Sequence, residues 1–257
     1  METKLASKFG NSAHIVLPKW YVGRRIKFIT QPRTFEDIKS GILGVLKPYL
    51  ENIVGVYLYG SYARNEQTMD SDMDILVIAA EKLRITGRID DYSVVSATTE
   101  EIEEALSSNA VLILPIIKEA KAIINPILLE AYKDSKFTKS NTLDFLEGTK
   151  KILELNKKGL ELGFEIGSLV YSLMLRIRGL LMIRAISNNG LYSKSLLLDF
   201  LEKEGFSGEK AVELYKIYSD ERNNMRIRES GSIAKNDIAK LLKTCETLLK
   251  EAKILLK

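Results

Sequence analysis

The chain has three successive patterns of apolar and polar positions. Over residues 1–30, short apolar runs alternate with turn residues, which predicts a small β element. Over residues 31–138, helical and strand-like runs alternate, which indicates a sheet covered by helices. Over residues 139–257, the apolar residues recur at helical spacing. We therefore predict an α+β fold with a small β element, a mixed sheet with helices and an all-α bundle.

The middle segment can be divided further by its hydrophobic period. Residues 35–50 are expected to form a helix, because apolar residues recur there every three or four positions. Strands are expected at 53–59, 74–80 and 89–96, and a last hairpin or edge strand is expected from 111–117 and 120–124. Thr98 or Thr99 is expected to cap a helix whose first turn is acidic.

Two residue types that are common in active sites are scarce. The chain has one histidine, His14, and one cysteine, Cys245. A zinc site built from Cys and His is therefore excluded, as is an intramolecular disulfide. A catalytic Ser-His or Cys-His arrangement would have to recruit His14. Catalysis must rest on carboxylates, hydroxyls, Lys, Arg or metal ions.

Membrane and export signals are not expected. The longest apolar run of the second half, 169–181, is interrupted by Arg176 and Arg178 and is shorter than the ~20 apolar residues that span a bilayer. Lys4 and Lys8 are followed by Gly10 and Asn11 and not by an apolar core. We expect a cytoplasmic protein with no membrane partner.

Positive charge is concentrated at the start of the chain. Residues 1–30 hold six lysines and arginines against one acid, Glu2, whereas the whole chain carries a net charge of +4. The other 227 residues are therefore close to neutral. A basic arm on a near-neutral body predicts contact with nucleic acid at that end, such as DNA. The alternative is that these cations only keep a small β element in solution.

A turn with the character of an anion site follows the first predicted strand. Gly60 comes directly after the apolar run and permits backbone angles and close approaches that a Cβ would block. Ser61 begins a helical turn, where free backbone N–H groups and the helix dipole favour phosphate. Arg64 lies one turn further on and adds a cation. We expect Gly60, Ser61 and Arg64 to bind a nucleotide.

Two aspartates stand at the start of the next predicted strand. Asp72 and Asp74 are two residues apart, so both side chains point to the same face of the strand. Two neighbouring carboxylates repel each other unless a cation lies between them, and Mg²⁺ prefers such hard oxygen ligands together with phosphate oxygens. We expect both aspartates to bind Mg²⁺ or Mn²⁺ and to be catalytic.

The segment from Gly60 to Asp74 resembles the signature of the minimal nucleotidyltransferases, within the DNA polymerase β-type superfamily. The shared pattern is Gly-Ser, a short helix, and then Ser-Asp-x-Asp before an apolar strand. The likeness spans about residues 35–135. The chain departs from it at Asn65, where the family usually has glycine; Asn tolerates left-handed backbone angles better than most residues.

The resemblance also implies a third carboxylate on the following strand. The leading Asp of that strand completes the metal site in the family, which implies Asp91 as a metal ligand and catalytic residue. Asp90 is its neighbour and would face the opposite side of the strand. The alternatives that remain open are Asp90, or an exposed carboxylate at a strand start with no role.

The flanking segments carry weaker resemblances. Residues 139–257 resemble a HEPN-type bundle, with Tyr171–Ala185 as its Arg-rich helix and 222–228 in the place of its ribonuclease motif. That motif needs a histidine, and none follows His14, so we predict no ribonuclease activity. We expect that Arg176, Arg178, Arg222 and Arg226 either contact nucleotide or substrate or are solvated or ion-paired. Residues 1–30 resemble an AbrB-like swapped hairpin, which implies a homodimer.

These observations predict an enzyme that transfers a nucleoside monophosphate from an NTP, ATP first among them, to a hydroxyl of a small molecule, a protein or an RNA end. Pyrophosphate would be released. The alternative is a dimeric DNA-binding or antitoxin-like regulator that binds nucleotide without turning it over.

Overall fold

The computed structural model describes residues 4, 6–10, 12–27, 33–68, 71–222 and 233–256. The chain divides into two compact units, Met1–Thr34 and Phe35–Lys257. The first unit contains strands β1 (Ser7–Phe9) and β2 (Ser12–His14), which pair antiparallel, and a 3-10 helix at Lys19–Tyr21. Residues 24–27, at the end of the segment expected to form a small β element, are not in a strand, and Phe28 and Ile29 lie outside the described residues.

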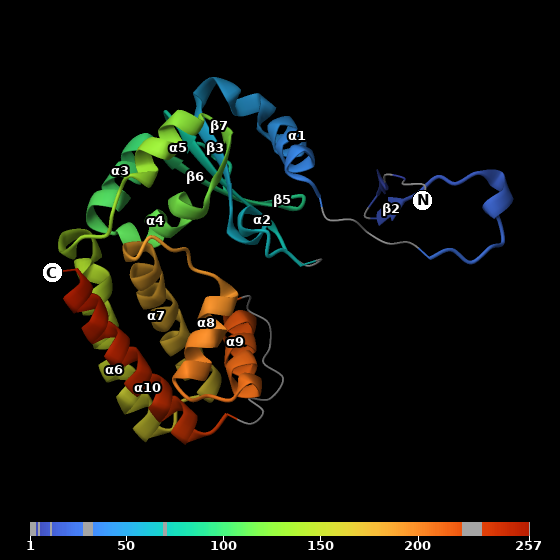
Figure 1. The fold of residues 1–257 in the computed structure, drawn as a ribbon. Coiled ribbons are helices and arrows are strands. Elements are labelled where there is room, and N and C mark those ends of the chain that lie inside the picture. Colours follow the sequence, from blue (N-terminus) through green and yellow to red (C-terminus); the bar gives the residue numbers. More distant parts are fainter. Residues whose placement is uncertain are drawn as a thin grey trace. The chain divides into compact units, whose positions relative to one another are not determined.

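The second unit is built on a five-stranded sheet (Figure 1). Its strands are β3 (Ile53–Tyr59), β4 (Met73–Ala79), β5 (Gly87–Ile89), β6 (Tyr92–Thr98) and β7 (Lys121–Ile124). They lie in the order β5-β6-β4-β3-β7. Only the β4–β6 pair is parallel among the pairs of this sheet. The predicted mixed sheet is therefore confirmed.

Each face of the sheet is covered by helices. One face packs against α1 (Phe35–Leu46), through residues such as Val56, Val77 and Ile42. The other face packs against α3 (Thr99–Ser108), α4 (Ala110–Glu119) and α5 (Pro126–Lys133). Side chains alternate between the faces along a strand. Asp72 and Asp74 therefore share the second face with Leu76, and that is the face covered by α4.

Helix α4 corrects the prediction of a strand at 111–117. Its residues Ala110, Val111 and Leu114 belong to the core of the helical bundle, whereas Ile113 and Ile117 belong to the core under the sheet. A helix buried on both sides has no polar stripe, so its amphipathic period is hidden. The prediction of an edge strand at 120–124 is confirmed by β7, which pairs with β3.

The expected strand at 89–96 is two strands. Asp90 and Asp91 form a tight turn that joins β5 to β6, and Ile89 pairs with Tyr92 across it. Asp90 adopts a positive φ of 51°, which such a two-residue hairpin turn requires. The third long strand of the sheet therefore begins only after the two aspartates.

Thr98 caps α3, as predicted. Its hydroxyl accepts a hydrogen bond from the Glu101 backbone N–H at 3.2 Å, and the Glu101 carboxylate accepts one from the Thr98 N–H at 3.0 Å. Replacing Thr98 with alanine is expected to lower the free energy of unfolding by about 1 kcal/mol. Urea unfolding measures this, with Thr99→Ala one residue further on as the control. Equal losses in the two variants would contradict the capping role.

The helical half begins with a long helix at Lys139. Its helices are α6 (Lys139–Leu162), α7 (Ile166–Ser187), α8 (Lys194–Lys203), α9 (Gly208–Arg222) and α10 (Lys235–Leu255). Helix α7 is long and apolar enough to cross a membrane by length and composition alone. Its buried residues, Leu173 and Ile177 among them, are part of the bundle core. That position is typical of the central helix of a bundle.

Candidate active site

The predicted anion-binding turn is formed at the end of β3. The short helix α2 (Gly60–Arg64) begins directly after Tyr59, and Gly60 adopts a φ of +75°. Asn65 closes this helix in the left-handed conformation with a φ of 58°. The asparagine that departs from the family pattern thus occupies a position where the backbone favours Gly or Asn.

The turn and the start of β4 touch each other. A Cβ added to Gly60 would lie 2.1 Å from Oδ2 of Asp74, far inside van der Waals contact. The absence of a side chain at position 60 therefore allows the Asp74 carboxylate to lie against the backbone of the turn. Asp72 precedes β4, and its Oδ1 forms an ion pair with Nη2 of Arg88 on β5 at 3.0 Å. Arg88 is a neighbour of the site that its sequence spacing did not indicate.

The two candidates for a third carboxylate lie in the β5–β6 turn. The Asp91 carbonyl accepts a hydrogen bond from the Met73 N–H at 3.2 Å, so Asp91 lies beside the start of β4. The register places Ser93 opposite Asp74, with no carboxylate at that position. Among the described residues, no group of three or more Asp, Glu, His or Cys side chains is arranged to hold a metal ion. The assignment of Asp91 to the site stays a prediction.

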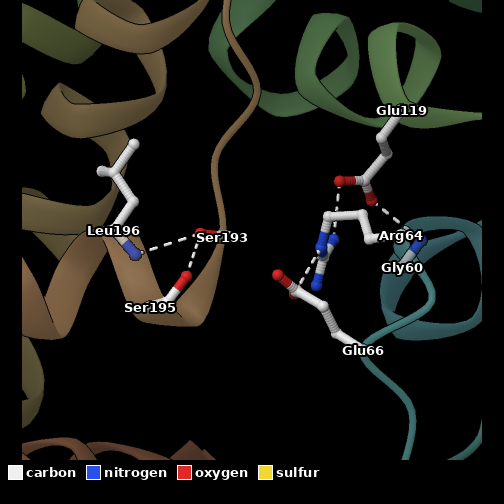
Figure 2. Close-up of polar contacts among 7 residues, drawn as sticks. All are labelled: Gly60, Arg64, Glu66, Glu119, Ser193, Ser195 and Leu196. Atoms are coloured by element: carbon white, nitrogen blue, oxygen red, sulfur yellow. Dashed lines mark hydrogen bonds and ion pairs between the residues drawn. The ribbon is translucent and has the colours of Figure 1, made fainter.

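A fourth acidic residue, Glu119, reaches the turn from the end of α4 (Figure 2). One of its carboxylate oxygens accepts a hydrogen bond from the Gly60 N–H at 2.8 Å, and the other pairs with Nη1 of Arg64 at 2.6 Å. Its side chain is only 10% exposed. No sequence signal pointed to Glu119, because it lies far from the motif and follows a run that reads as a strand.

Arg64 is placed at the turn, as expected, but its guanidinium is shared between two acids. Besides Glu119, it pairs through Nε with Oε2 of Glu66 at 2.9 Å. Both contacts are charge-assisted and fix the orientation of the guanidinium plane. Arg64 is therefore a held cation beside Gly60, and its contact with a nucleotide stays a prediction.

The Asp74 carboxyl has an unusual affinity for protons. Burial raises its pKa to about 6, Arg222 lowers the pKa, and the negative charges of Asp72 and Glu119 raise it. Burial also raises the pKa of Tyr59 to about 12, with Asp74 beside it. Ionising this buried carboxyl next to a second carboxylate costs free energy, and a bound divalent cation would lower that cost. The residues present therefore fit a magnesium or manganese ion held by Asp72 and Asp74.

This pKa predicts how stability depends on pH in the absence of divalent ions. Between pH ~4 and ~6 the folded protein holds a proton on Asp74 that the unfolded chain has released, so stability falls as pH rises through that window. Replacing Asp74 with asparagine should stabilise the metal-free protein at neutral pH, on the order of 1–3 kcal/mol. Urea unfolding in EDTA tests this. An equal effect at pH ~4.5 and ~7.5 would contradict it.

The helical bundle presents cations and tyrosines to the same region. Arg178 on α7 donates a hydrogen bond from Nη1 to the Tyr218 hydroxyl at 3.3 Å, and its guanidinium carbon lies 5.4 Å from the ring centre of Tyr192. Burial raises the pKa of Tyr192, and the nearby charges of Arg178 and Arg64 oppose that rise. Arg222 at the end of α9 is close enough to Asp74 to lower its pKa.

The other arginines that the sequence singled out are placed differently. Arg176 lies over the ring of Phe145 at 5.4 Å and has buried Cys245 as a neighbour, so it packs within the bundle. Arg226 lies outside the described residues. Of the three arginines within the described residues, Arg178 lies near Glu119 and Arg222 lies near Asp74, whereas Arg176 does not contact this region.

Comparison with known proteins finds a family match for part of the chain and solved structures of similar fold. Residues 42–131 match the family described as polymerase beta nucleotidyltransferase. No curated protein is significantly similar to the chain in sequence. The fold is similar to that of the spectinomycin adenyltransferase AAD(9) from Enterococcus faecialis, solved with ATP and spectinomycin, with a TM-score of 0.52 and 16% identity over 85% of this chain and 100% of that chain.

A second solved structure is a nucleotidyltransferase-like protein from Exiguobacterium sibiricum 255-15, with a TM-score of 0.37 and 14% identity over 85% of this chain and 77% of that chain. The matched residues span the Gly60 turn, Asp72, Asp74 and Glu119. Residues 42–131 are therefore similar to a polymerase beta-type nucleotidyltransferase domain, and this similarity supports an enzyme of the nucleotidyltransferase class.

Proposed function

We propose that the enzyme transfers a nucleoside monophosphate from an NTP to a hydroxyl group of an acceptor and releases pyrophosphate. The observation that carries the proposal is the contact between Gly60 and the Asp74 carboxylate. It brings a turn suited to phosphate against a pair of carboxylates suited to a divalent cation. The triphosphate would then lie between the two elements.

Each residue of the motif has a distinct part in this proposal. Asp72 and Asp74 hold Mg²⁺ or Mn²⁺, which neutralises charge on the triphosphate when it is bound. Gly60 allows the phosphates a close approach, Ser61 offers them a backbone N–H and a hydroxyl, and Arg64 offers positive charge. Asp91 completes the site and accepts the proton of the attacking hydroxyl.

The bundle is proposed to contribute positive charge to the bound nucleotide and to limit access of water. Arg178 and Arg222 lie near Glu119 and Asp74, respectively. The resemblance to a HEPN-type bundle does not imply cleavage of RNA here, because the only histidine of the chain is His14. The bundle is therefore proposed as a cover for the site and not as a ribonuclease.

ATP is the first donor to test, because the adenyltransferase of similar fold was solved with ATP. The experiment incubates the full chain with each α-labelled NTP, Mg²⁺ or Mn²⁺, and in turn small hydroxyl compounds, proteins and RNA ends. The expected result is label attached to one acceptor class together with stoichiometric pyrophosphate. Release of inorganic phosphate without transfer of label would contradict the proposal.

A second candidate function rests on the first unit of the chain. Large apolar side chains of this unit face solvent, with Phe9 and Trp20 each 68% exposed, and Arg24 and Arg25 are also exposed. An apolar surface of this kind favours a partner, and we propose a homodimer that contacts DNA through the basic residues. Salt-dependent DNA binding that is lost without residues 1–30, in a protein that transfers no label, would select this regulator over the enzyme.

A further inference from the structure

The Glu119 carboxylate ties together parts of the site that are far apart in the sequence. It extends from the end of α4, and its two oxygens contact different elements of the turn: the Gly60 N–H at 2.8 Å and the Arg64 guanidinium at 2.6 Å. Figure 2 shows both contacts converging on this one side chain. The contact to Gly60 gives the first N–H of α2 the partner that a helix N-terminus lacks within the helix.

The side chains of Glu119 and Arg64 are both largely buried. That of Glu119 is 10% exposed, and that of Arg64 is 19% exposed. Charge-assisted hydrogen bonds in such surroundings are stronger and more restrictive than those on an open surface. Glu66 holds the same guanidinium from its other side, at 2.9 Å. The turn is therefore fixed at its first residue and again at Arg64.

This arrangement reaches the metal-binding strand through Gly60. The Gly60 backbone lies so close to Oδ2 of Asp74 that no Cβ would fit between them, so any shift of the turn changes the space available to that carboxylate. A group that fixes Gly60 thereby fixes the separation between the phosphate-binding turn and Asp74. Alignment of a triphosphate and its cation depends on such fixed separations.

We propose that Glu119 is a positioning residue for the nucleotide, and that it acts through Gly60 and Arg64. This inference rests on the proposed nucleotidyl transfer at the same site. It assigns Glu119 no contact with the acceptor and no proton transfer. Loss of its carboxylate should therefore weaken productive binding of the NTP and leave the KM for the acceptor unchanged.

The test compares Glu119→Ala, Glu119→Gln, Arg64→Ala and the double variant Glu119→Ala/Arg64→Ala in the full chain. Two charge-assisted contacts are lost in Glu119→Ala, so its KM for the NTP should rise roughly 10-fold to 100-fold. Glu119→Gln keeps an oxygen for the Gly60 N–H, so its KM should lie between those of wild type and Glu119→Ala. The double variant should be little worse than the more affected single variant, because both residues act in one network.

The matched control is Glu251→Gln, which breaks the exposed ion pair of Glu251 with Arg184 on the bundle. It should leave both KM values unchanged. Thermal unfolding of every variant separates a folding defect from a positioning defect, since a smaller folded fraction lowers kcat without changing KM. A fall in kcat or in melting temperature at unchanged KM for the NTP would overturn the inference, as would additive effects in the double variant.

The wild-type enzyme separates this inference from the proposed function. If wild type transfers no label, the proposed function fails. If wild type transfers label and Glu119→Ala has the same KM for the NTP, the positioning role fails while the proposed function stands.

Discussion

Replacing Asp74 with asparagine is expected to reduce nucleotidyl transfer about a thousand-fold or more. The substitution keeps the shape of the side chain but removes the negative charge that lies against the Gly60 turn. Charge neutralisation by a bound cation contributes several kcal/mol to a displacement at phosphorus, and each 1.4 kcal/mol changes the rate about tenfold. Transfer from α-labelled NTP under saturating Mg²⁺ measures the loss.

The control for this prediction is Asp144→Asn, which removes an exposed carboxylate on α6 and should leave transfer unchanged. Asp72→Asn should also lower transfer strongly, although its carboxylate is more exposed and is shared with Arg88. Transfer within tenfold of wild type in Asp74→Asn would exclude Asp74 as the principal ligand of the cation.

The second large effect is expected from Gly60→Ala. The added Cβ would lie 2.1 Å from the Asp74 carboxylate, and alanine also disfavours the φ of +75° at this position. Either the turn or the carboxylate must move. We expect transfer to fall roughly 100-fold, because a misplacement of about 1 Å can cost that much, together with a loss of stability.

Gly163→Ala is the matched control, because it separates strain of the backbone from the clash. Gly163 has a φ of +76°, but nothing lies within 4 Å of a Cβ placed there. Like Gly60→Ala, Gly163→Ala should lower the free energy of unfolding because alanine disfavours a positive φ, but it should keep full transfer activity. If Gly60→Ala and Gly163→Ala lost the same stability and both retained activity, the contact between Gly60 and Asp74 would not matter for function.

Much of the sheet could be predicted from local sequence signals. The strand β3 is a short apolar run that ends at Gly60, β4 is a run rich in β-branched residues that follows Ser71 and Asp72, and Thr98 stands before an acidic first turn. The short helix after Gly60 and the left-handed backbone at Asn65 follow from local chemistry as well. These features depend on neighbours in the sequence, and the sequence therefore reports them.

Secondary structure was predicted wrongly where tertiary contacts determine the backbone conformation. The run at 111–117 contains β-branched residues and Pro115, yet it forms a helix because both of its sides are buried in different cores. The turn at Asp90 lacks the Asn-Gly or Asp-Gly pair that usually marks a two-residue hairpin. Its position moved both candidate third carboxylates out of the strand.

Glu119 shows a different limit of sequence reasoning. Its partners Gly60 and Arg64 are 59 and 55 residues away along the chain. No spacing rule joins them, because the contact exists only once α4 has packed on the sheet. The prediction of Gly60, Arg64 and Asp74 as site residues came from the motif, whereas the acid that holds two of them came from the fold.

The most direct test of the site is a crystal structure of the full chain with Mg²⁺ and a non-hydrolysable NTP analogue. We expect a cation bound by carboxylate oxygens of Asp72 and Asp74 at about 2.0–2.1 Å, with phosphate oxygens completing its coordination. The phosphates should lie on the Gly60–Ser61 turn, with Glu119 still bound to Gly60. A triphosphate bound away from this turn, or a cation that contacts neither aspartate, would contradict the account.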